Sequence, residues 1–437
     1  MNTEPTIFAV STAPGRSGIA VIRVSGPVAG KALRALGGSL DRPRQAGLVS
    51  LVDPGTSERL DRALTLWFAG PASFTGEDVA EFHIHGGRAV VAAVVDALGQ
   101  MPGLEAAAPG GFTRQAFANG KLDLTEVEGL ADLIGAETEA QRRMALRQME
   151  GGLSDIYEAW RRELVGLMAH VEADIDFADE DVPQDLTRSA MGGMEALAVA
   201  MTRHLNDDKR GERLRAGFRI VLAGPPNAGK SSLLNALARR DVAIVSPEPG
   251  TTRDLIDVAL DLGGYPVEVT DTAGIRDTEG AIEKEGVRRA LTRADNADLV
   301  LWLRPADRAD APAAPRDLQG DVLDVVTKCD LATGPADGLG VSIVSGAGLE
   351  TLIDILQSRA EAGLAGSEDA VITRSRHRRS VGRARDALLG AISARTSGAE
   401  FVAENLRVAA SELGRLTGRV DVEDLLDVIF ADFCIGK

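Results

Sequence analysis

The segment Gly224-Pro-Pro-Asn-Ala-Gly-Lys-Ser231 has the residue types and spacing of a loop that holds the phosphates of a nucleotide. The backbone N–H groups of such a loop point at the phosphates, and the positive end of the following helix strengthens the attraction. Lys230 would reach the β- and γ-phosphates, and Ser231 would bind Mg²⁺. The expected nucleotide contacts here are Asn227, Ala228, Gly229, Lys230, Ser231 and Ser232. The pattern predicts a nucleotide site, and a chance glycine-rich turn is the weaker alternative.

Two later motifs favour guanine over adenine. The run Asp271, Thr272, Ala273, Gly274 has the form of a Mg²⁺-side aspartate followed by a glycine that meets the γ-phosphate, which is typical of GTPases. The run Thr327, Lys328, Cys329, Asp330 resembles the guanine-recognition pattern Asn-Lys-x-Asp. The carboxylate of Asp330 would accept hydrogen bonds from the guanine N1 and N2 hydrogens, a donor pair that adenine lacks. These motifs predict GTP as the nucleotide.

The guanine motif departs from its usual form at the first position. Thr327 stands where Asn is usual, and a hydroxyl replaces only part of the hydrogen bonding of an amide. A weaker but retained affinity for guanine is therefore expected. Ser345 and Gly346 stand where GTPases place a base-contact loop, although this dipeptide carries no weight by itself.

The segment Gly250-Thr-Thr-Arg-Asp254 resembles the first switch of a GTPase, and it follows a proline-containing stretch that begins at Ser246. Thr252 would be the second hydroxyl ligand of Mg²⁺, ordered when the γ-phosphate is present. Gly250 and Thr251 would lie beside it against the nucleotide. An ordinary β-turn is the alternative for this segment.

The position after Gly274 lacks the glutamine with which Ras-type GTPases orient the attacking water, because Ile275 occupies it. Another group must orient the water, and another positive charge must stabilise the transition state. The nearby acidic residues are Glu279, Glu283 and Glu285, although carboxylates at the start of a helix also serve simply to stabilise that helix. The side-chain oxygen of Asn227 could hold a monovalent cation, such as K⁺, where other GTPases place an arginine finger.

Segments on both sides of these motifs resemble the MnmE (TrmE) family of tRNA-modification GTPases. The C-terminal Phe433-Cys-Ile-Gly-Lys437 is similar to the terminal Cys-x-Gly-Lys of that family. The N-terminal segments that resemble its folate domain are Pro14–Gly26, Phe74–Asp78, His85–Gly87 and Phe112–Leu124. The resemblance covers essentially the whole chain in order, and both flanks point to this one family.

The resemblance implies a set of roles that spacing alone does not give. Glu283 and Arg276 match catalytic positions of the second switch, and Cys434 lies near the modification centre, with acid/base help, orientation or covalent chemistry left open. The implied K⁺ ligands are Asn227, Ser246, Glu248 and Thr251. The implied folate-binding residues are Arg23, Glu81, Lys121 and Lys437.

The resemblance also implies cofactors and partners. The cofactors would be Mg²⁺, K⁺ and 5-formyltetrahydrofolate or a related folate, bound across a homodimer of N-terminal domains. The partner would be MnmG, an FAD-dependent protein, in a heterotetramer that acts on tRNA. The implied reaction installs a carboxymethylaminomethyl or aminomethyl group at C5 of the wobble uridine. A regulatory GTPase in ribosome assembly or RNA metabolism is the competing hypothesis, because a G domain alone fits both.

The elements that must position these residues form several predicted domains. Short apolar runs between Gly and Pro predict an N-terminal α+β domain over 1–120, and a period of 3.6 residues predicts helices over 121–212 and 369–437. A Ras-like α/β P-loop G domain over 213–368 would be inserted into the all-α domain. The predicted strands are Ile7–Ser11, Gly18–Ser25, Leu64–Trp67, Ala80–His85, Phe218–Ala223, Val267–Thr270, Val322–Val326 and Val341–Val344. The predicted helices outside the all-α part include Val90–Leu98 and Ile282–Ala294, and Arg304–Pro315 is a predicted loop.

Size and composition agree with a multidomain protein. A length of 437 residues suggests about three domains. No stretch has the length of a signal peptide or a membrane helix, so a cytoplasmic protein without a membrane is expected. The net charge of −17 is unusual for a protein that acts on RNA. The stretch Thr373–Arg385 holds six arginines, either as an RNA-facing helix or as a solvated face.

Overall fold

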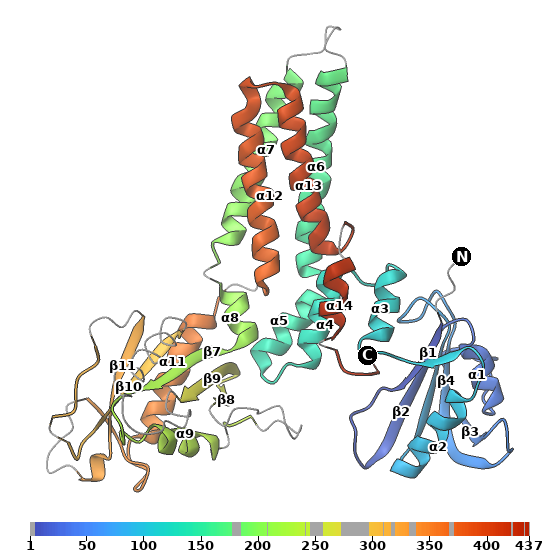
Figure 1. Cartoon of the computed structure of the whole chain (residues 1–437), viewed down its shortest axis with the longest axis horizontal. Coiled ribbons are helices and arrows are strands. Elements are labelled where there is room, and N and C mark those ends of the chain that lie inside the picture. The colour runs from blue at the N-terminus through green and yellow to red at the C-terminus, as the bar shows by residue number, and fades with distance from the viewer. Residues whose placement is uncertain are drawn as a thin grey trace, which may run out of the picture. The chain divides into compact units, whose positions relative to one another are not determined.

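The computed structural model describes residues 5–176, 185–207, 209–240, 242–244, 257–271, 297–308, 310–315, 320–331, 338–366, 371–420, 423–431 and 433–436. The chain forms two compact units. The first comprises Met1–Ala131, Gln148–Val165 and Ala410–Lys437, and the second comprises Asp132–Arg147 and Gly166–Ala409. The predicted fold class is confirmed: an N-terminal α+β part, an all-α part, and a P-loop α/β domain inserted into the helical sequence (Figure 1).

The N-terminal part is a six-stranded sheet of order β3-β4-β5-β2-β1-β6. Its strands are β1 (Thr6–Val10), β2 (Ser17–Ser25), β3 (Gly47–Val52), β4 (Arg59–Phe68), β5 (Val79–Gly86) and β6 (Leu104–Ala106). Only β1 and β6 pair in parallel. The helices α1 (Ala29–Ala35) and α2 (Arg88–Gly99) share one apolar core with inward-facing Ile22, Phe82 and Ile84. Because side chains alternate along a strand, Arg23, Glu81 and His83 lie on the other face.

The sequence analysis missed three elements of this sheet domain, α1, β3 and β6. The helix α1 has seven residues and β6 has three, which is too short for a periodic pattern to stand out. Along β3, Leu48 is exposed although it is apolar, so the expected alternation is weak. The short helix α3 (Gly111–Ala118) follows β6 and was not predicted either.

The all-α part consists mainly of long helices. These are α4 (Leu124–Ile134), α5 (Glu139–Met149), α6 (Gly152–Asp176), α7 (Asp185–Leu205), α12 (Ser375–Ser393), α13 (Ala399–Thr417) and α14 (Glu423–Ala431), with a 3₁₀ turn at Ala394–Thr396. A capping box starts α4, since Asp123 Oδ1 accepts from the Glu126 N–H at 2.9 Å and Glu126 Oε2 accepts from the Asp123 N–H at 2.7 Å. Local capping chemistry thus places the boundary where the helical pattern begins.

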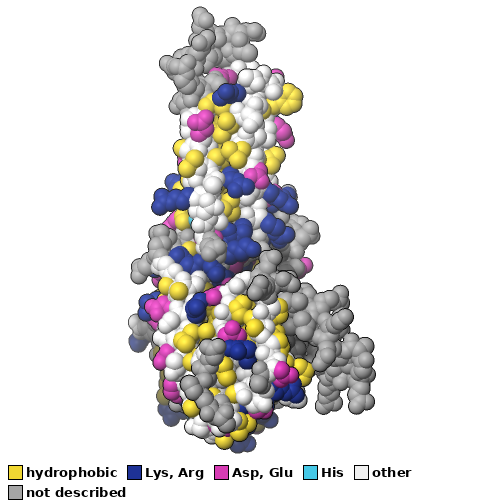
Figure 2. Space-filling model, turned by 90° about the vertical axis from the view of Figure 1, so that its left-hand side faces the viewer, with side chains coloured by type: hydrophobic (Ala, Val, Ile, Leu, Met, Phe, Trp, Pro, Cys, Tyr) yellow, Lys and Arg dark blue, Asp and Glu magenta, His cyan; other side chains and the backbone are white. Residues whose placement is uncertain are grey.

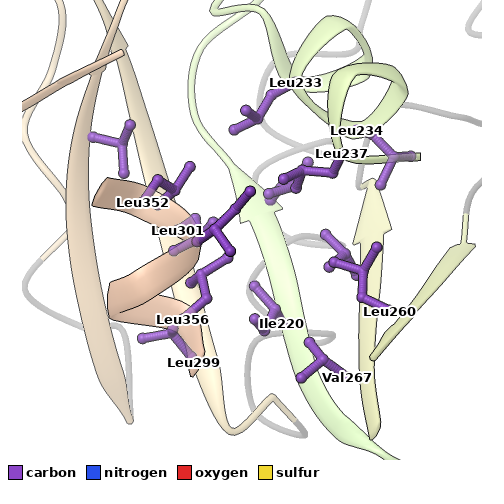
Figure 3. Packing of buried hydrophobic residues seen from close by; sticks show 14 of the residues in the cluster. Ile220, Leu233, Leu234, Leu237, Leu260, Val267, Leu299, Leu301, Leu352 and Leu356 are labelled. Carbon is purple, nitrogen blue, oxygen red and sulfur yellow. The ribbon is translucent and has the colours of Figure 1, made fainter. Parts of the chain in front are cut away.

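The P-loop domain is a six-stranded sheet of order β12-β11-β10-β7-β9-β8. Its strands are β7 (Phe218–Ala223), β8 (Asp257–Leu262), β9 (Tyr265–Asp271), β10 (Leu299–Pro305), β11 (Asp321–Thr327) and β12 (Leu339–Val341). All neighbours are parallel except the hairpin β8–β9. The helices α9 (Lys230–Ala238) and α11 (Leu349–Leu364) cover one face, where Leu233 and Leu356 meet Ile220 and Leu301 (Figure 3). A parallel strand buried on both faces has a nearly continuous apolar sequence, as residues 299–303 of β10 have.

Two predicted elements of this domain had wrong boundaries. The predicted strand Val341–Val344 ends at Val341, and the residues after it form a turn in which the Ser342 N–H donates to the Ala347 carbonyl at 2.9 Å. Val344 is 90% exposed, so its apolar side chain misled the prediction. The predicted loop begins too early, because Arg304 and Pro305 belong to β10. The predicted helix Ile282–Ala294 lies outside the described residues.

Among the described residues, no helix combines the length and the apolar character needed to cross a membrane.

Candidate functional site

The phosphate loop occupies residues 224–229, between the end of β7 and the start of α9. Gly224 has φ +143°, and a Cβ added there would lie 2.4 Å from the carbonyl oxygen of Leu303 on β10. Only glycine fits this approach and this dihedral angle. Gly229 (φ +91°) and Asn227 (φ +62°) also have left-handed backbone conformations. The loop is therefore held against the neighbouring strand at the carboxyl end of the sheet, where α/β proteins bind ligands.

Lys230 folds over this loop. Its Nζ donates to the carbonyl oxygens of Gly224 at 2.9 Å and Pro225 at 3.1 Å. Burial lowers the pKa of Lys230, and the charge of Asp271 partly opposes that shift. The ammonium group is thus placed at the loop, ready to exchange carbonyl contacts for phosphate oxygens.

Ser231 and Asp271, the two residues predicted on the Mg²⁺ side, lie together. The Ser231 hydroxyl and Asp271 Oδ2 are 2.5 Å apart, and Asp271 is buried at the end of β9. The parallel register places Asp271 beside Leu222 of β7, just before the phosphate loop. The ends of β7 and β9 and the start of α9 therefore bring the Ser231 and Asp271 oxygens together.

The guanine motif lies at the end of β11, two strands away from β7. The buried Thr327 hydroxyl donates to the Ala228 carbonyl oxygen at 2.6 Å. Lys328 (φ +56°) donates from Nζ to Asp307 Oδ2 at 2.8 Å, and this hydrogen bond lowers the pKa of Asp307. Asp330 lies in the 3₁₀ turn Cys329–Leu331 that follows. The sequence analysis missed Asp307, which it left in a surface loop without a role.

The predicted base-contact loop follows β12. The Ser345 N–H donates to the Ser342 hydroxyl at 3.2 Å, and the Gly346 N–H donates to the Ser342 carbonyl at 3.0 Å. Ser342 is fully buried, so it holds this turn at the carboxyl end of the sheet. The predicted site residues that lie outside the described part are Ser246, Glu248, Gly250, Thr251, Thr252, Thr272, Ala273, Gly274, Arg276, Glu283 and Lys437.

A second group of predicted residues lies on the open face of the N-terminal sheet. Arg23 and Glu81 are register partners on β2 and β5, and Arg23 donates to Glu81 Oε1 from Nη2 at 2.9 Å and from Nε at 3.0 Å. The guanidinium lies 5.8 Å from the ring centre of Phe74 and 5.5 Å from that of Phe112. Sequence motifs contained both rings, but gave no reason to assign them a role.

Lys121 belongs to the same neighbourhood. A Cβ added at Gly76 would lie 3.3 Å from Lys121 Cε, so the lysine stem runs along the loop that also carries Phe74. The second carboxylate oxygen of Glu81, Oε2, lies 3.2 Å from Nε2 of His83. A carboxylate, a guanidinium and two aromatic rings therefore lie together at this face, and Lys121 lies along the neighbouring loop.

The C-terminal segment is anchored to the N-terminal domain within the first unit. Gly436 (φ +98°) packs so closely that a Cβ there would lie 2.2 Å from the carbonyl oxygen of Val10. The Gly110 N–H donates to the Cys434 carbonyl oxygen at 3.5 Å, and Phe433 is buried beside Phe430. The Cys434 side chain itself is exposed. The segment that carries the thiol is thus held against the N-terminal domain, while the thiol side chain is exposed.

Two arginines of the arginine-rich stretch at the start of α12 form ion pairs within the protein. Arg374 pairs with Asp132 at 2.7 Å, and Arg378 pairs with Asp207 at 2.5 Å and with Glu212 at 3.3 Å. Figure 2 shows that Lys and Arg side chains gather over one stretch of the helical bundle, with Asp and Glu among them. Arg374 and Arg378 therefore have a structural role. Neither alternative from the sequence, an RNA-facing helix or a solvated face, describes these two residues.

Among the described side chains, no group of three or more His, Cys, Asp or Glu is arranged to hold a metal ion. The Mg²⁺ ligand Thr252 and most of the implied K⁺ ligands fall outside those residues.

The loop between β7 and α9, with the buried aspartate beside it, defines the class of protein as a P-loop GTPase with a G domain. Residues 124–434 match the family model described as MnmE helical domain, and residues 6–121 match that of the GTP-binding protein TrmE N-terminus. The chain therefore belongs to the MnmE (TrmE) family of tRNA modification GTPases.

Full-length relatives support the same family assignment. The chain is 56% identical to the tRNA modification GTPase MnmE of Parvibaculum lavamentivorans, over 99% of this chain and 100% of that protein. It is 53% identical to that of Rhodospirillum rubrum, over 100% of both chains. It is 48% identical to the human mitochondrial 5-taurinomethyluridine-[tRNA] synthase subunit GTPB3, over 99% of this chain and 93% of that protein. The protein is accordingly a GTPase of tRNA modification, with GTP as substrate.

We predict that Gly224→Ala weakens GTP binding by at least about tenfold, or ~1.4 kcal/mol, because the added Cβ displaces the phosphate loop from β10. Equilibrium titration with a fluorescent GTP analogue measures this change. Pro226→Ala, an exposed position in the same loop, should keep the affinity of the parent protein. Unchanged affinity in Gly224→Ala would contradict the loop geometry.

Proposed function

We propose that this chain couples GTP hydrolysis to the installation of a carboxymethylaminomethyl or aminomethyl group at C5 of the wobble uridine of certain tRNAs. The carbon would come from a formylated tetrahydrofolate, and the FAD-dependent protein MnmG would share the reaction in a heterotetramer. One observation carries the proposal: the segment with Cys434 is anchored to a domain whose side chains are suited to binding a folate. The proposed domains are 1–120, 121–212, 213–368 and 369–437, acting on tRNA in the cytoplasm.

The folate part of the proposal is supported by the chemistry of the open sheet face. A pterin ring presents guanidine-type donors, which a carboxylate such as Glu81 accepts, and its flat rings suit Phe74 and Phe112. The glutamate tail of a folate is anionic, which suits Lys121, Arg23 and Lys437. These residues fit the group, and a bound folate would supply the one-carbon unit.

A homodimer of N-terminal domains is supported by apolar exposure on the same face. Leu48 and Leu64 are register partners on β3 and β4, and they are 56% and 43% exposed. Ile19 on β2 is 59% exposed. An apolar sheet face that adjoins a charged binding group is typical of an interface. A second copy of this chain would cover it and would enclose the Arg23–Glu81 pair.

The proposed hydrolysis uses a water that attacks the γ-phosphate in line, breaks the bond to the β-phosphate oxygen, and yields GDP and phosphate. Lys230 and the loop N–H groups would hold the phosphates, with Ser231 and Thr252 as Mg²⁺ ligands. Glu283 would orient the water, and Arg276 would support the second switch. Asn227, Ser246, Glu248 and Thr251 would hold K⁺, and the exposed Asn227 side chain on a left-handed backbone supports this assignment.

The proposed coupling to the helical domain is supported by a contact at the β8–β9 hairpin, whose far end leads into Asp271. A capping box of Thr138 and Gln141 starts α5, and the Ala140 N–H, which this box leaves unpaired, donates to the Gly264 carbonyl at 3.0 Å. Gln141 also donates from Nε2 to the Arg215 carbonyl at 3.2 Å. A shift of the hairpin on hydrolysis would therefore act directly on α5.

We predict that Glu283→Ala slows hydrolysis of bound GTP by about 10²-fold or more, as expected for loss of a group that positions the nucleophile. GTP affinity should stay near the parent value, because Glu283 is not assigned to ground-state binding. Single-turnover phosphate release, measured in potassium and in sodium, tests both assignments. Parent-like hydrolysis by Glu283→Ala would remove its catalytic role, and equal rates in the two salts would remove the K⁺ site.

We predict that Ala140→Pro uncouples the two activities, because proline removes the N–H that binds Gly264 while the first helical turn tolerates it. GTP hydrolysis should be retained, and wobble-uridine modification should fall by about tenfold, ~1.4 kcal/mol in coupling. Glu139→Pro, which keeps the Ala140 N–H, is the matched control and should modify tRNA normally. Normal modification by Ala140→Pro would exclude this contact as the route.

Mass spectrometry of nucleosides from bulk tRNA tests the proposed function itself. In cells without this chain, the 5-substituted wobble uridines should disappear, and the intact chain should restore them. Cys434→Ser should fail to restore them, whereas Cys329→Ser, which changes the other cysteine, should succeed. An unchanged nucleoside profile would leave a regulatory GTPase in ribosome assembly or RNA metabolism as the better hypothesis.

A further inference from the structure

Positive charge is concentrated in two segments of this acidic chain. Residues 203–215 and 374–385 together hold eleven Lys or Arg and three Asp or Glu, whereas the whole chain holds 48 and 65. The first segment runs from the last turn of α7 into α8 (Arg210–Ala216), and the second opens α12. The negative balance of the chain therefore does not extend to these two segments.

Arg378 of α12 joins the two segments. Its guanidinium donates to the Leu205 carbonyl oxygen at 2.7 Å and to Asp207 Oδ1 at 2.5 Å. The backbones also approach closely, because a Cβ added at Gly211 would lie 2.4 Å from the Ile372 carbonyl oxygen. The start of α12 therefore lies against the end of α7 and the start of α8, and their charges share one neighbourhood.

Three cations beside this junction are exposed. Arg379 directly follows Arg378, and Arg203 and Lys209 are each two residues, or about 8 Å of chain, from an acceptor of that arginine. Within the described part of the chain, these three exposed side chains pair with no carboxylate. Asp207, which could neutralise them, is held by Arg378. Figure 2 shows Lys and Arg side chains gathered over one stretch of the helical bundle.

The partner that fits these cations is a polyanion. Neighbouring cations without partners repel one another, and a row of phosphates relieves that repulsion while its own counterions are released. The chain belongs to a family of tRNA modification GTPases, and the backbone of tRNA is such a row. Because the net charge of −17 repels RNA from the acidic surfaces, a local group of cations decides where RNA is held.

We propose that Arg203, Lys209 and Arg379 form a basic surface that binds the phosphate backbone of the tRNA. The proposal rests on the proposed function and adds the place at which the RNA is held. Contacts to phosphates carry no sequence information, so the basic surface binds tRNAs alike and leaves their selection to other groups. It lies where the chain enters the G domain, since α8 ends directly before β7.

The test measures the affinity of the full-length chain for an unmodified tRNA transcript with uridine at the wobble position, over a range of salt concentrations. The triple variant Arg203→Gln, Lys209→Gln, Arg379→Gln should bind about tenfold more weakly or worse at low salt. The slope of log affinity against log salt should become shallower by about 2, as expected for three lost phosphate contacts. A tRNA of unrelated sequence should show the same changes.

The matched control removes the same charge elsewhere. Lys31→Gln, Arg395→Gln, Arg407→Gln changes one exposed lysine and two exposed arginines, and Arg395 lies beyond the far end of α12. This variant should keep the parent affinity and salt slope. Both variants should unfold at the parent temperature and hydrolyse GTP at the parent rate, because all the changed side chains are exposed. If the triple variant does not fold, Arg379→Gln alone decides, with a slope shallower by about 0.7.

Three results would overturn the inference. The first is parent-like affinity with an unchanged salt slope in the triple variant, which would leave the basic surface to an acidic protein partner. The second is an equal loss in the control variant, because net charge and not this surface would then attract tRNA. The third is a parent chain that does not bind tRNA at all. The proposed function fails separately, since the nucleoside profile of cells tests it.

Discussion

The close approach of Gly224 to the Leu303 carbonyl oxygen is the constraint on which the G domain depends. It joins β7 to β10 at the point where the phosphate loop begins, and it leaves no space for a side chain. The apolar core under α9 and α11 holds those strands in register (Figure 3). Backbone N–H groups can then face a phosphate without rearrangement, so the cost of ordering the loop is met when the protein folds.

Charged side chains have a structural role in this chain. The net charge is −17, yet several arginines are held by carboxylates within the protein. Asp132 is the clearest case, because it receives Arg215 at 2.9 Å and Arg374 at 2.7 Å. These arginines lie on the segments through which the chain enters and leaves the G domain. A largely buried carboxylate therefore connects these two segments, and its removal would take one ion pair from each of the two arginines.

The N-terminal domain shows how strand alternation builds a site. One face of the sheet is covered by α1 and α2, so the opposite face is free to carry polar side chains among apolar ones. Pairing of β2 with β5 puts Arg23 directly opposite Glu81, residues that are 58 positions apart in the sequence. The C-terminal segment reaches this domain through Gly436, where backbone contact again excludes a side chain.

The sequence by itself determined the class of the protein and the phosphate loop, because glycine spacing and the strand-loop-helix order are local properties of the chain. It also determined the long helices, whose period is local. Only the tertiary structure decided the partners of Thr327, Lys328 and Arg374, and the placement of Phe74 and Phe112 beside Arg23. Those contacts join residues that are distant in sequence, and strand order and helix packing bring them together. A local pattern contains no information about them.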